Sequence, residues 1–138
     1  MTQQAIDGRW KCVSSERFDD YMAAVGVPIF VRMIAANVQV TLVIKVDGNR
    51  YQCRQESAFN TTELNFTLDE EFVETTPDGR KFNTTCTLED GKVVQRQKAI
   101  NPSDKDSTIT RFIENDRLVT ILECGEVNAR REYERQSE

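Results

Sequence analysis

The sequence predicts an all-β protein in which about ten antiparallel strands close into a barrel, with two short helices near the start of the chain. Short segments of alternating apolar and polar residues recur every ~8–14 residues, which is typical of an antiparallel sandwich or barrel. Turn signals such as Asp47-Gly48 and Asp90-Gly91 separate these segments. A barrel is favoured because closing the sheet removes its exposed edges.

The helical region lies between residues 16 and 36. Its first apolar residues have the i, i+3, i+4, i+7 spacing of an amphipathic helix, and they are Phe18, Tyr21, Met22 and Val25. Gly26 interrupts this pattern, and Pro28 suits the first turn of a second helix over residues 29–36. In that helix we expect three apolar residues near one face, namely Phe30, Met33 and Ile34.

The strands are expected at residues 8–13, 38–46, 50–57, 62–68, 72–76, 80–88, 92–98, 107–113, 117–124 and 127–135. The segment 92–98 has polar residues at both alternating positions, so some of them must face inward. A dry core does not tolerate unpaired polar groups. A barrel of about ten strands is also wider than the eight-stranded size that side chains fill. The sequence therefore predicts an internal cavity.

Composition and charge exclude several classes of function. The 138 residues suit a single domain, 1–138, and their net charge of −5 argues against nucleic-acid binding. The chain has no His, and its four cysteines are scattered, so we expect no metal site and no cofactor. We expect free thiols, and the alternative is disulfides, which would require an oxidising compartment. It shows no signal-peptide pattern and no apolar run of membrane-spanning length, so we expect a cytoplasmic protein.

Several motifs along the chain together resemble one family. They are Gly8-Arg9-Trp10-Lys11, the segment 14–22 followed by Val25-Gly26-Val27, Glu56-Ser57-Ala58-Phe59, Glu70-Glu71-Phe72, Asp78-Gly79-Arg80-Lys81 and Arg131-Glu132-Tyr133-Glu134-Arg135. In this order and spacing they resemble the intracellular lipid-binding proteins of the fatty-acid-binding type. The resemblance implies an up-and-down, lipocalin-like (calycin) barrel, a two-helix lid over about 16–36 and ligand binding without catalysis.

Three residues are candidates for binding a ligand carboxylate. Arg131 and Tyr133 alternate with solvent-like residues on the last strand, so both point inward. The pattern leaves the direction of Arg111 open, and the resemblance implies that it also faces the cavity. Two guanidinium groups and a phenol hydroxyl form a receptor for a carboxylate. The alternative is that the arginines pair with internal acids such as Glu74, Asp78 or Glu56.

Other candidate residues would contact the ligand tail or form the portal, although ordinary core packing remains an alternative for each. They are Phe18, Phe30, Val31, Leu42, Phe59, Leu64, Phe66, Asp78, Phe82 and Leu122. By resemblance Phe59 is the portal gate, Trp10 is a structural residue near the closed end, and Asp78 and Arg80 form an interior polar pair.

The expected function is to bind and transport a long-chain fatty acid, or a similar carboxylate lipid, inside the cell as a monomer. Two alternatives are a retinoic-acid-type carrier and a ligand-dependent adaptor that delivers lipid to a nuclear receptor, which would add a nuclear location. The helical segment has few basic residues, so charge-driven membrane contact would be transient at most. An enzyme is disfavoured because without His the chain has no Ser–His or Cys–His dyad.

Overall fold

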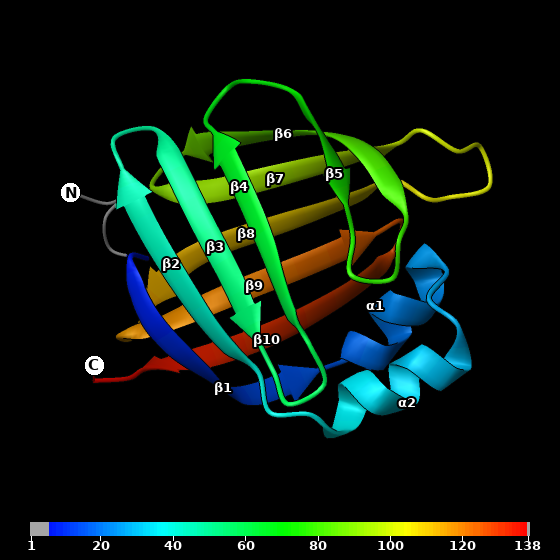
Figure 1. Ribbon diagram of the computed structural model, residues 1–138, viewed down its shortest axis with the longest axis horizontal. Helices are drawn as coiled ribbons and strands as arrows, with labels where there is room; N and C mark the ends of the chain where they lie inside the picture. The colour runs from blue at the N-terminus through cyan, green and yellow to red at the C-terminus, as the bar shows by residue number, and fades with distance from the viewer. Residues whose placement is uncertain (1–5, 138) are drawn as a thin grey trace.

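The computed structural model describes residues 6–137, in which ten strands and two helices form (Figure 1). In chain order they are β1 (Gly8–Glu16), α1 (Phe18–Val25), α2 (Ile29–Asn37), β2 (Thr41–Asp47), β3 (Arg50–Glu56), β4 (Thr61–Thr67), β5 (Phe72–Thr75), β6 (Lys81–Glu89), β7 (Lys92–Ala99), β8 (Ser107–Glu114), β9 (Arg117–Cys124) and β10 (Val127–Arg135). Each predicted helix and strand is present. The largest differences in their bounds are at the end of β1 and the start of β2.

The start of β2 shows why its boundary was predicted too early. Val38 and Val40 continue the apolar alternation of the strand, but β2 begins only at Thr41. The preceding residues bond to β1 in another way: the Val40 carbonyl accepts from the Cys12 amide, and the Gln39 side chain donates to the Cys12 carbonyl. At this end of the strand, a hydrogen bond from the Gln39 side chain thus takes the place of a backbone hydrogen bond to β1.

All ten strands belong to one antiparallel sheet. Its order is β4-β3-β2-β1-β10-β9-β8-β7-β6-β5, so the first and last strands of the chain are neighbours. Every other pairing joins strands that follow one another along the chain. The sheet curls into a barrel that the two helices cover at one end (Figure 1), which confirms the predicted fold class.

Backbone pairing leaves a gap in the barrel between β4 and β5 in the part of the chain that the structure describes. The expectation that closure removes both sheet edges is therefore wrong. Leu68 and Asp69, in the connection between these strands, donate backbone hydrogen bonds to the β2–β3 turn and to Cys86 of β6. These bonds attach the connection to the β2–β3 turn and to β6, while β4 and β5 remain unpaired with each other. Phe66 and Phe72 stack beside the gap, with ring centroids 6.2 Å apart.

The tight turns have the backbone geometry that their sequences predict. Asp90 and Gly91 have φ values of 51° and 79°, and Asn115 and Asp116 have values of 51° and 63°. Type I′ hairpin turns require positive φ at both central residues, which Gly, Asn and Asp tolerate better than other residues. These dipeptides therefore fix the β6–β7 and β8–β9 hairpins.

The main apolar core fills the barrel at the end away from the helices. Trp10 is fully buried there, and its indole Nε1 donates a 2.9 Å hydrogen bond to the Ile6 carbonyl. The Arg135 guanidinium lies 4.2 Å from the centroid of the Trp10 ring. Around Trp10 pack Val40, Leu42, Ile44, Tyr51, Phe66, Cys86, Val93, Leu118 and Tyr133. The placement of Trp10 agrees with its expected structural role.

Helix α1 closes the other end of the barrel. Its residues Tyr21, Met22 and Val25 are buried, as the helical spacing predicts. Gly26 ends the helix with φ of 100°, a conformation that costs glycine little. The buried face of α1 packs with side chains of β8, β9 and β10, namely Ile109, Leu122, Cys124 and Ala129.

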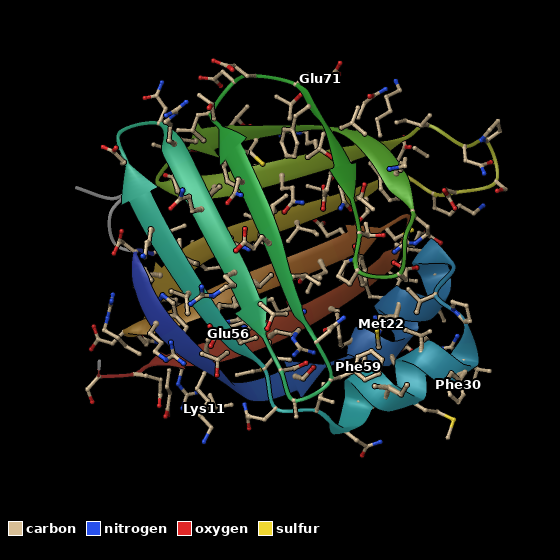
Figure 2. The ribbon with its side chains drawn as sticks, viewed as in Figure 1. Lys11, Met22, Phe30, Glu56, Phe59 and Glu71 are labelled. Carbon is tan, nitrogen blue, oxygen red and sulfur yellow. The ribbon has the colours of Figure 1, made fainter. Side chains whose placement is uncertain are left out.

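Helix α2 presents its faces differently from the sequence prediction. Phe30 and Met33 are exposed to solvent, whereas Ile34 lines the internal cavity. The prediction that these three residues share a face is therefore wrong. Figure 2 shows Phe30 pointing away from the barrel. In residues 6–137 neither helix is long enough or apolar enough to cross a bilayer.

Candidate ligand-binding cavity

The barrel wall and the helical lid enclose a cavity of about 310 Å³. Its lining comes from α1, α2, both halves of the sheet and the β3–β4 and β5–β6 connections. Most of the lining is apolar near the lid, and a group of polar side chains crosses the wall from β5 to β10. The predicted cavity is therefore present, with both an apolar and a polar part.

Arg131 and Tyr133 lie together in the polar part, and both are buried. Arg131 Nε donates to the Tyr133 hydroxyl at 3.2 Å, and Arg131 Nη1 donates to Ser15 Oγ at 3.4 Å. The guanidinium also lies 4.0 Å from the centroid of the Phe18 ring. Burial opposes its positive charge, but Tyr133 and Cys12 raise the pKa of Arg131 above the ordinary arginine value. The group is therefore a buried, permanent cation.

Arg111 also lines the cavity, on β8. Its Nη1 donates a 2.7 Å hydrogen bond to Oε1 of Gln95 on β7. The three candidate residues for carboxylate binding are thus on one wall, and Thr120 of β9 lies in register between Arg111 and Arg131. The inward direction of Arg111, which the alternation left open, is fixed by the sheet register.

The internal acids have other partners than the two arginines. Glu74 accepts hydrogen bonds from Thr84 and Gln95 at 2.9 Å and from Gln97 at 3.1 Å. Asp78 pairs with Arg80, and Glu56 pairs with Arg9 and Arg54 near the surface. Among the described residues no ion pair joins Arg111 or Arg131 to any of these acids. The alternative in which both arginines are neutralised directly by Glu74, Asp78 or Glu56 is therefore wrong.

The expected interior pair of Asp78 and Arg80 lies where the β5–β6 turn meets the lid. Arg80 Nε is 2.6 Å from Asp78 Oδ2, and Arg80 Nη1 donates to the Val25 carbonyl at the end of α1. Burial opposes the charge of Asp78, but hydrogen bonds from Arg80 and Thr76 lower the pKa of its carboxyl. This pair therefore links the turn to helix α1.

Most of the tail and portal candidates line the cavity. They are Phe18, Val31, Leu42, Phe59, Leu64, Asp78 and Leu122. Phe59 is largely exposed and lies in the β3–β4 connection beside the lid (Figure 2). The apolar members of this set surround the space next to Arg131 and Tyr133, so one elongated molecule can reach both parts of the cavity.

Three aromatic candidates lie outside the lining. Phe30 is 71% exposed on the outer face of α2. Phe66 stacks between Tyr51 and Phe72 in the core at the closed end. Phe82 is fully buried, with the Arg80 guanidinium 5.3 Å from its ring centroid. The apolar character of these residues places them in strands or helices. It does not show whether each one lies in the core, in the cavity wall or on the outer surface.

Comparisons with known proteins agree with this architecture. A sequence model of the lipocalin / cytosolic fatty-acid binding protein family matches residues 7–136. The chain belongs to this family. Fatty acid-binding protein homolog 5 of Caenorhabditis elegans is 51% identical over 136 residues, which cover 99% of this chain and all of that protein. Human fatty acid-binding protein 5 is 40% identical, and the match covers 97% of each chain.

Solved structures of family members have the same fold. Apo lipid binding protein 8 of Caenorhabditis elegans superposes with a TM-score of 0.93 at 37% identity, covering 96% of each chain. The fatty acid binding protein of Schistosoma mansoni, solved in complex with arachidonic acid, has a TM-score of 0.90 at 30% identity. That match covers 99% of this chain and all of the schistosome chain.

Sequence reasoning about this family member missed Ser15, Gln95 and Thr120 as neighbours of the arginines, and it predicted Phe18 only as a tail or portal residue. Ser15 and Phe18 contact Arg131, Gln95 contacts Arg111, and Thr120 lies between the two arginines. The polar alternation of residues 92–98 indicated that β7 places polar groups inward. It could not show which groups on other strands they meet, because that depends on the register of the sheet.

The cysteines are free, as expected. Burial raises the pKa of the Cys86 thiol to about 12. Burial also raises the pKa of Cys53, the cysteine that lines the internal cavity. Because the thiolate is the reactive form, Cys53 is a weak nucleophile at neutral pH.

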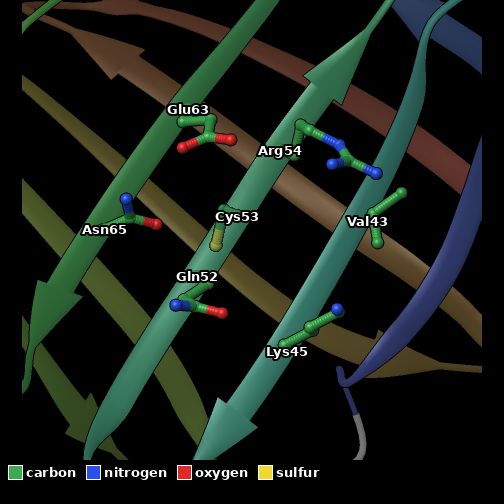
Figure 3. Close-up of a pocket in the computed structure, with 7 residues that line it drawn as sticks. All are labelled: Val43, Lys45, Gln52, Cys53, Arg54, Glu63 and Asn65. Carbon is green, nitrogen blue, oxygen red and sulfur yellow. The ribbon is translucent and has the colours of Figure 1, made fainter.

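A second, smaller concavity of about 120 Å³ lies at β2, β3 and β4 (Figure 3). Most of the side chains that line it are polar and exposed, and they are Lys45, Gln52, Arg54, Glu63 and Asn65. This groove contains both charge signs and lacks the apolar walls of the internal cavity. The internal cavity is therefore the candidate site.

Proposed function

We propose that this protein binds a long-chain fatty acid, or a similar carboxylate lipid, in the barrel and transports it inside the cell. The observation that carries the proposal is the buried Arg131, whose described contacts are all uncharged groups. A buried cation without an anionic partner is unfavourable by several kcal/mol. A carboxylate from the ligand would supply that partner.

The head-group contacts follow from the chemistry of the site. The Arg131 guanidinium can donate two parallel hydrogen bonds to one carboxylate, and Tyr133 can donate its hydroxyl proton. Arg111, on the same wall, adds a second positive charge. An alcohol carries no negative charge to balance either arginine, so the site favours an acid.

The apolar part of the cavity would supply most of the affinity. Burying each CH₂ group contributes about 0.8 kcal/mol, so a ~16-carbon tail gives on the order of 10 kcal/mol before costs. Association and ordering subtract at least several kcal/mol. The tail alone therefore gives a dissociation constant of about 1 μM, and the head-group contacts would lower it toward the nanomolar range.

The relatives support a fatty acid as the ligand. The matched proteins of Caenorhabditis elegans and human are named fatty acid-binding proteins, and the schistosome structure contains arachidonic acid. The family description is cytosolic, which supports the proposed cytoplasmic location. We propose a monomeric carrier that leaves its ligand chemically unchanged, because one chain supplies the whole cavity and its thiol there is a weak nucleophile.

Replacement of Arg131 tests the proposed function. Arg131→Met keeps an apolar stem of similar length and removes the charge. We expect palmitic acid to bind about 100-fold more weakly, which corresponds to about 3 kcal/mol, while hexadecanol binding changes less than about twofold. Displacement of a fluorescent lipid by each compound measures both constants.

Arg130→Met is the matched control, because Arg130 is on the opposite face of β10 and pairs with Glu114 and Glu132. We expect it to leave both affinities unchanged. Equal losses for the acid and the alcohol in Arg131→Met would contradict the head-group assignment. Retinoic acid, tested beside palmitic acid, shows which tail the cavity prefers.

A further inference from the structure

The side chain of Gln95 lies between an internal carboxyl group, that of Glu74, and an internal guanidinium, that of Arg111. Its Nε2 donates to Glu74 Oε1 at 2.9 Å, and its Oε1 accepts from Arg111 Nη1 at 2.7 Å. Gln95 is 1% exposed, and Glu74 is 9% exposed. A guanidinium can only donate and a carboxylate can only accept, so a single orientation of the amide satisfies both neighbours.

Arg111, which binds the amide oxygen of Gln95, also lies in the proposed carboxylate site. Thr120 is paired with Arg111 on one side and with Arg131 on the other in the strand register. Its hydroxyl is buried and has no hydrogen-bond partner among the described residues. A buried hydroxyl of this kind needs a partner, and it faces the cavity. A ligand oxygen held between the two arginines would provide one.

Separation of Glu74 from Arg111 has an electrostatic consequence. In a poorly solvated cavity a direct ion pair between them would cancel much of the positive potential that attracts an acid. Gln95 satisfies both groups with a neutral amide, so the charge of Arg111 remains available. Arg111 is also held by a short hydrogen bond, which fixes one nitrogen of its guanidinium.

We propose that Gln95 is a specificity-determining residue, which insulates Arg111 from Glu74 and positions the Arg111 guanidinium to act with Arg131 on the ligand carboxylate. This inference rests on the proposed carboxylate site. It adds that the preference for an acid over an alcohol depends on a residue that need not touch the ligand.

Gln95→Met and Gln97→Met form a matched pair of variants that tests this role. Each removes one buried glutamine that donates to Glu74, but among the described residues Gln97 has no hydrogen bond to Arg111. We expect Gln95→Met to weaken palmitic acid about tenfold and hexadecanol less than about twofold. Gln97→Met should leave the ratio of the two dissociation constants unchanged. If both variants change the ratio of the palmitic acid and hexadecanol dissociation constants equally, the proposal is overturned.

A double-mutant cycle with Arg111→Met shows whether Gln95 acts through Arg111. In the Arg111→Met background, Gln95→Met should cause no further change in the acid-to-alcohol ratio. A further loss of about tenfold there would overturn the proposal. If Gln95→Met does not fold, Gln95→Asn is used, since the shorter amide cannot reach both Glu74 and Arg111 and should weaken the acid by a similar factor. Unchanged acid binding in Gln95→Asn would also overturn the proposal.

These experiments distinguish a failure of the role proposed for Gln95 from a failure of the proposed carboxylate site. If Arg131→Met lowers acid affinity but Gln95→Met does not, the carboxylate site stands and the role of Gln95 is refuted. If neither Arg131→Met nor Arg111→Met changes the acid-to-alcohol ratio, the carboxylate site is refuted, and the role of Gln95 is refuted with it.

Discussion

Arg131 is surrounded by groups that orient it without neutralising it. Tyr133 and Ser15 accept hydrogen bonds from its nitrogen atoms, and the Phe18 ring lies against its flat face. Phe18 is also the first residue of α1. The first turn of the lid is thereby in direct contact with the cation of the proposed carboxylate site. Binding at the head group and the position of the lid are therefore physically connected.

The Tyr133 hydroxyl can be tested separately from its ring. Tyr133→Phe keeps the packing and removes the oxygen that accepts from Arg131. We expect palmitic acid to bind roughly 10–100-fold more weakly, because one hydrogen bond to a charged group is lost, with little change for hexadecanol. Isothermal titration calorimetry gives both constants.

Tyr21→Phe is the control for Tyr133→Phe. The Tyr21 hydroxyl bonds to Ser107 at the start of β8, and among the described residues it has no hydrogen bond to Arg111 or Arg131. Its removal should lower the melting temperature without changing the preference for acid over alcohol. If both variants alter that preference equally, Tyr133 has no special role at the head group.

At the residue scale, the sequence predicted the direction of individual side chains better than it predicted the contacts between them. The alternation on the last strand is clean, so it placed Arg131 and Tyr133 inside the barrel correctly. Arg111 has apolar neighbours on both faces of its strand, so periodicity could not orient it. The contact of Gln95 with Glu74 joins positions 21 residues apart, and only the sheet register brings them together.

Among the elements, strands and turns were predictable because two local rules govern them. Alternation with a period of two identifies a half-buried strand, and Asp-Gly pairs or similar dipeptides fix the hairpins. Helix α2 was predictable as a helix but not in its orientation. Its apolar residues are spread around the helix, so the side that faces the barrel depends on how α1 and the strands position it.

The β5–β6 turn should give the lid region an acid-sensitive contact. The lowered pKa of Asp78 means that its ionised form is favoured in the folded state. A depressed carboxyl pKa stabilises the fold above the unfolded value, about 3.9, and this stabilisation is lost as pH falls through the folded value. We expect Asp78→Asn to destabilise the protein by about 1–2 kcal/mol at pH 7 and to flatten the decline in stability below about pH 4. Urea denaturation at a series of pH values measures this.

Glu70→Gln provides the comparison for Asp78→Asn, because Glu70 is an exposed acid in the β4–β5 connection. Its pH profile should follow that of the unmodified protein. A profile for Asp78→Asn that also runs parallel to the unmodified protein would show that the Asp78–Arg80 pair does not couple protonation to stability.

For the whole molecule, strand number and barrel width were enough to predict a cavity. The sheet is less closed than the avoidance of exposed edges predicts. Within residues 6–137 the structure leaves β4 and β5 unpaired, and the residues that connect them donate hydrogen bonds to the β2–β3 turn and to β6 instead. Such bonds involve loop residues without a periodic pattern, so no strand-level rule could reveal them.

The sheet order permits an unusual rearrangement of the chain. Read from β5 through β10 and then from β1 to β4, every strand lies beside the next one. The present first and last strands are also close, since the Gln136 amide donates to the Arg9 carbonyl at 2.7 Å. A circular permutant that starts at β5, ends at β4 and joins the old ends by a flexible linker would thus break no strand pair.

We expect this permutant to fold and to bind palmitic acid within about threefold of the original affinity, because new ends are tolerated where few contacts cross. Circular dichroism and ligand titration would show it. A permutant opened instead between β8 and β9, which are paired along their length, should fold less well. Where the sheet is already open, the polypeptide can begin and end without the loss of a strand pairing.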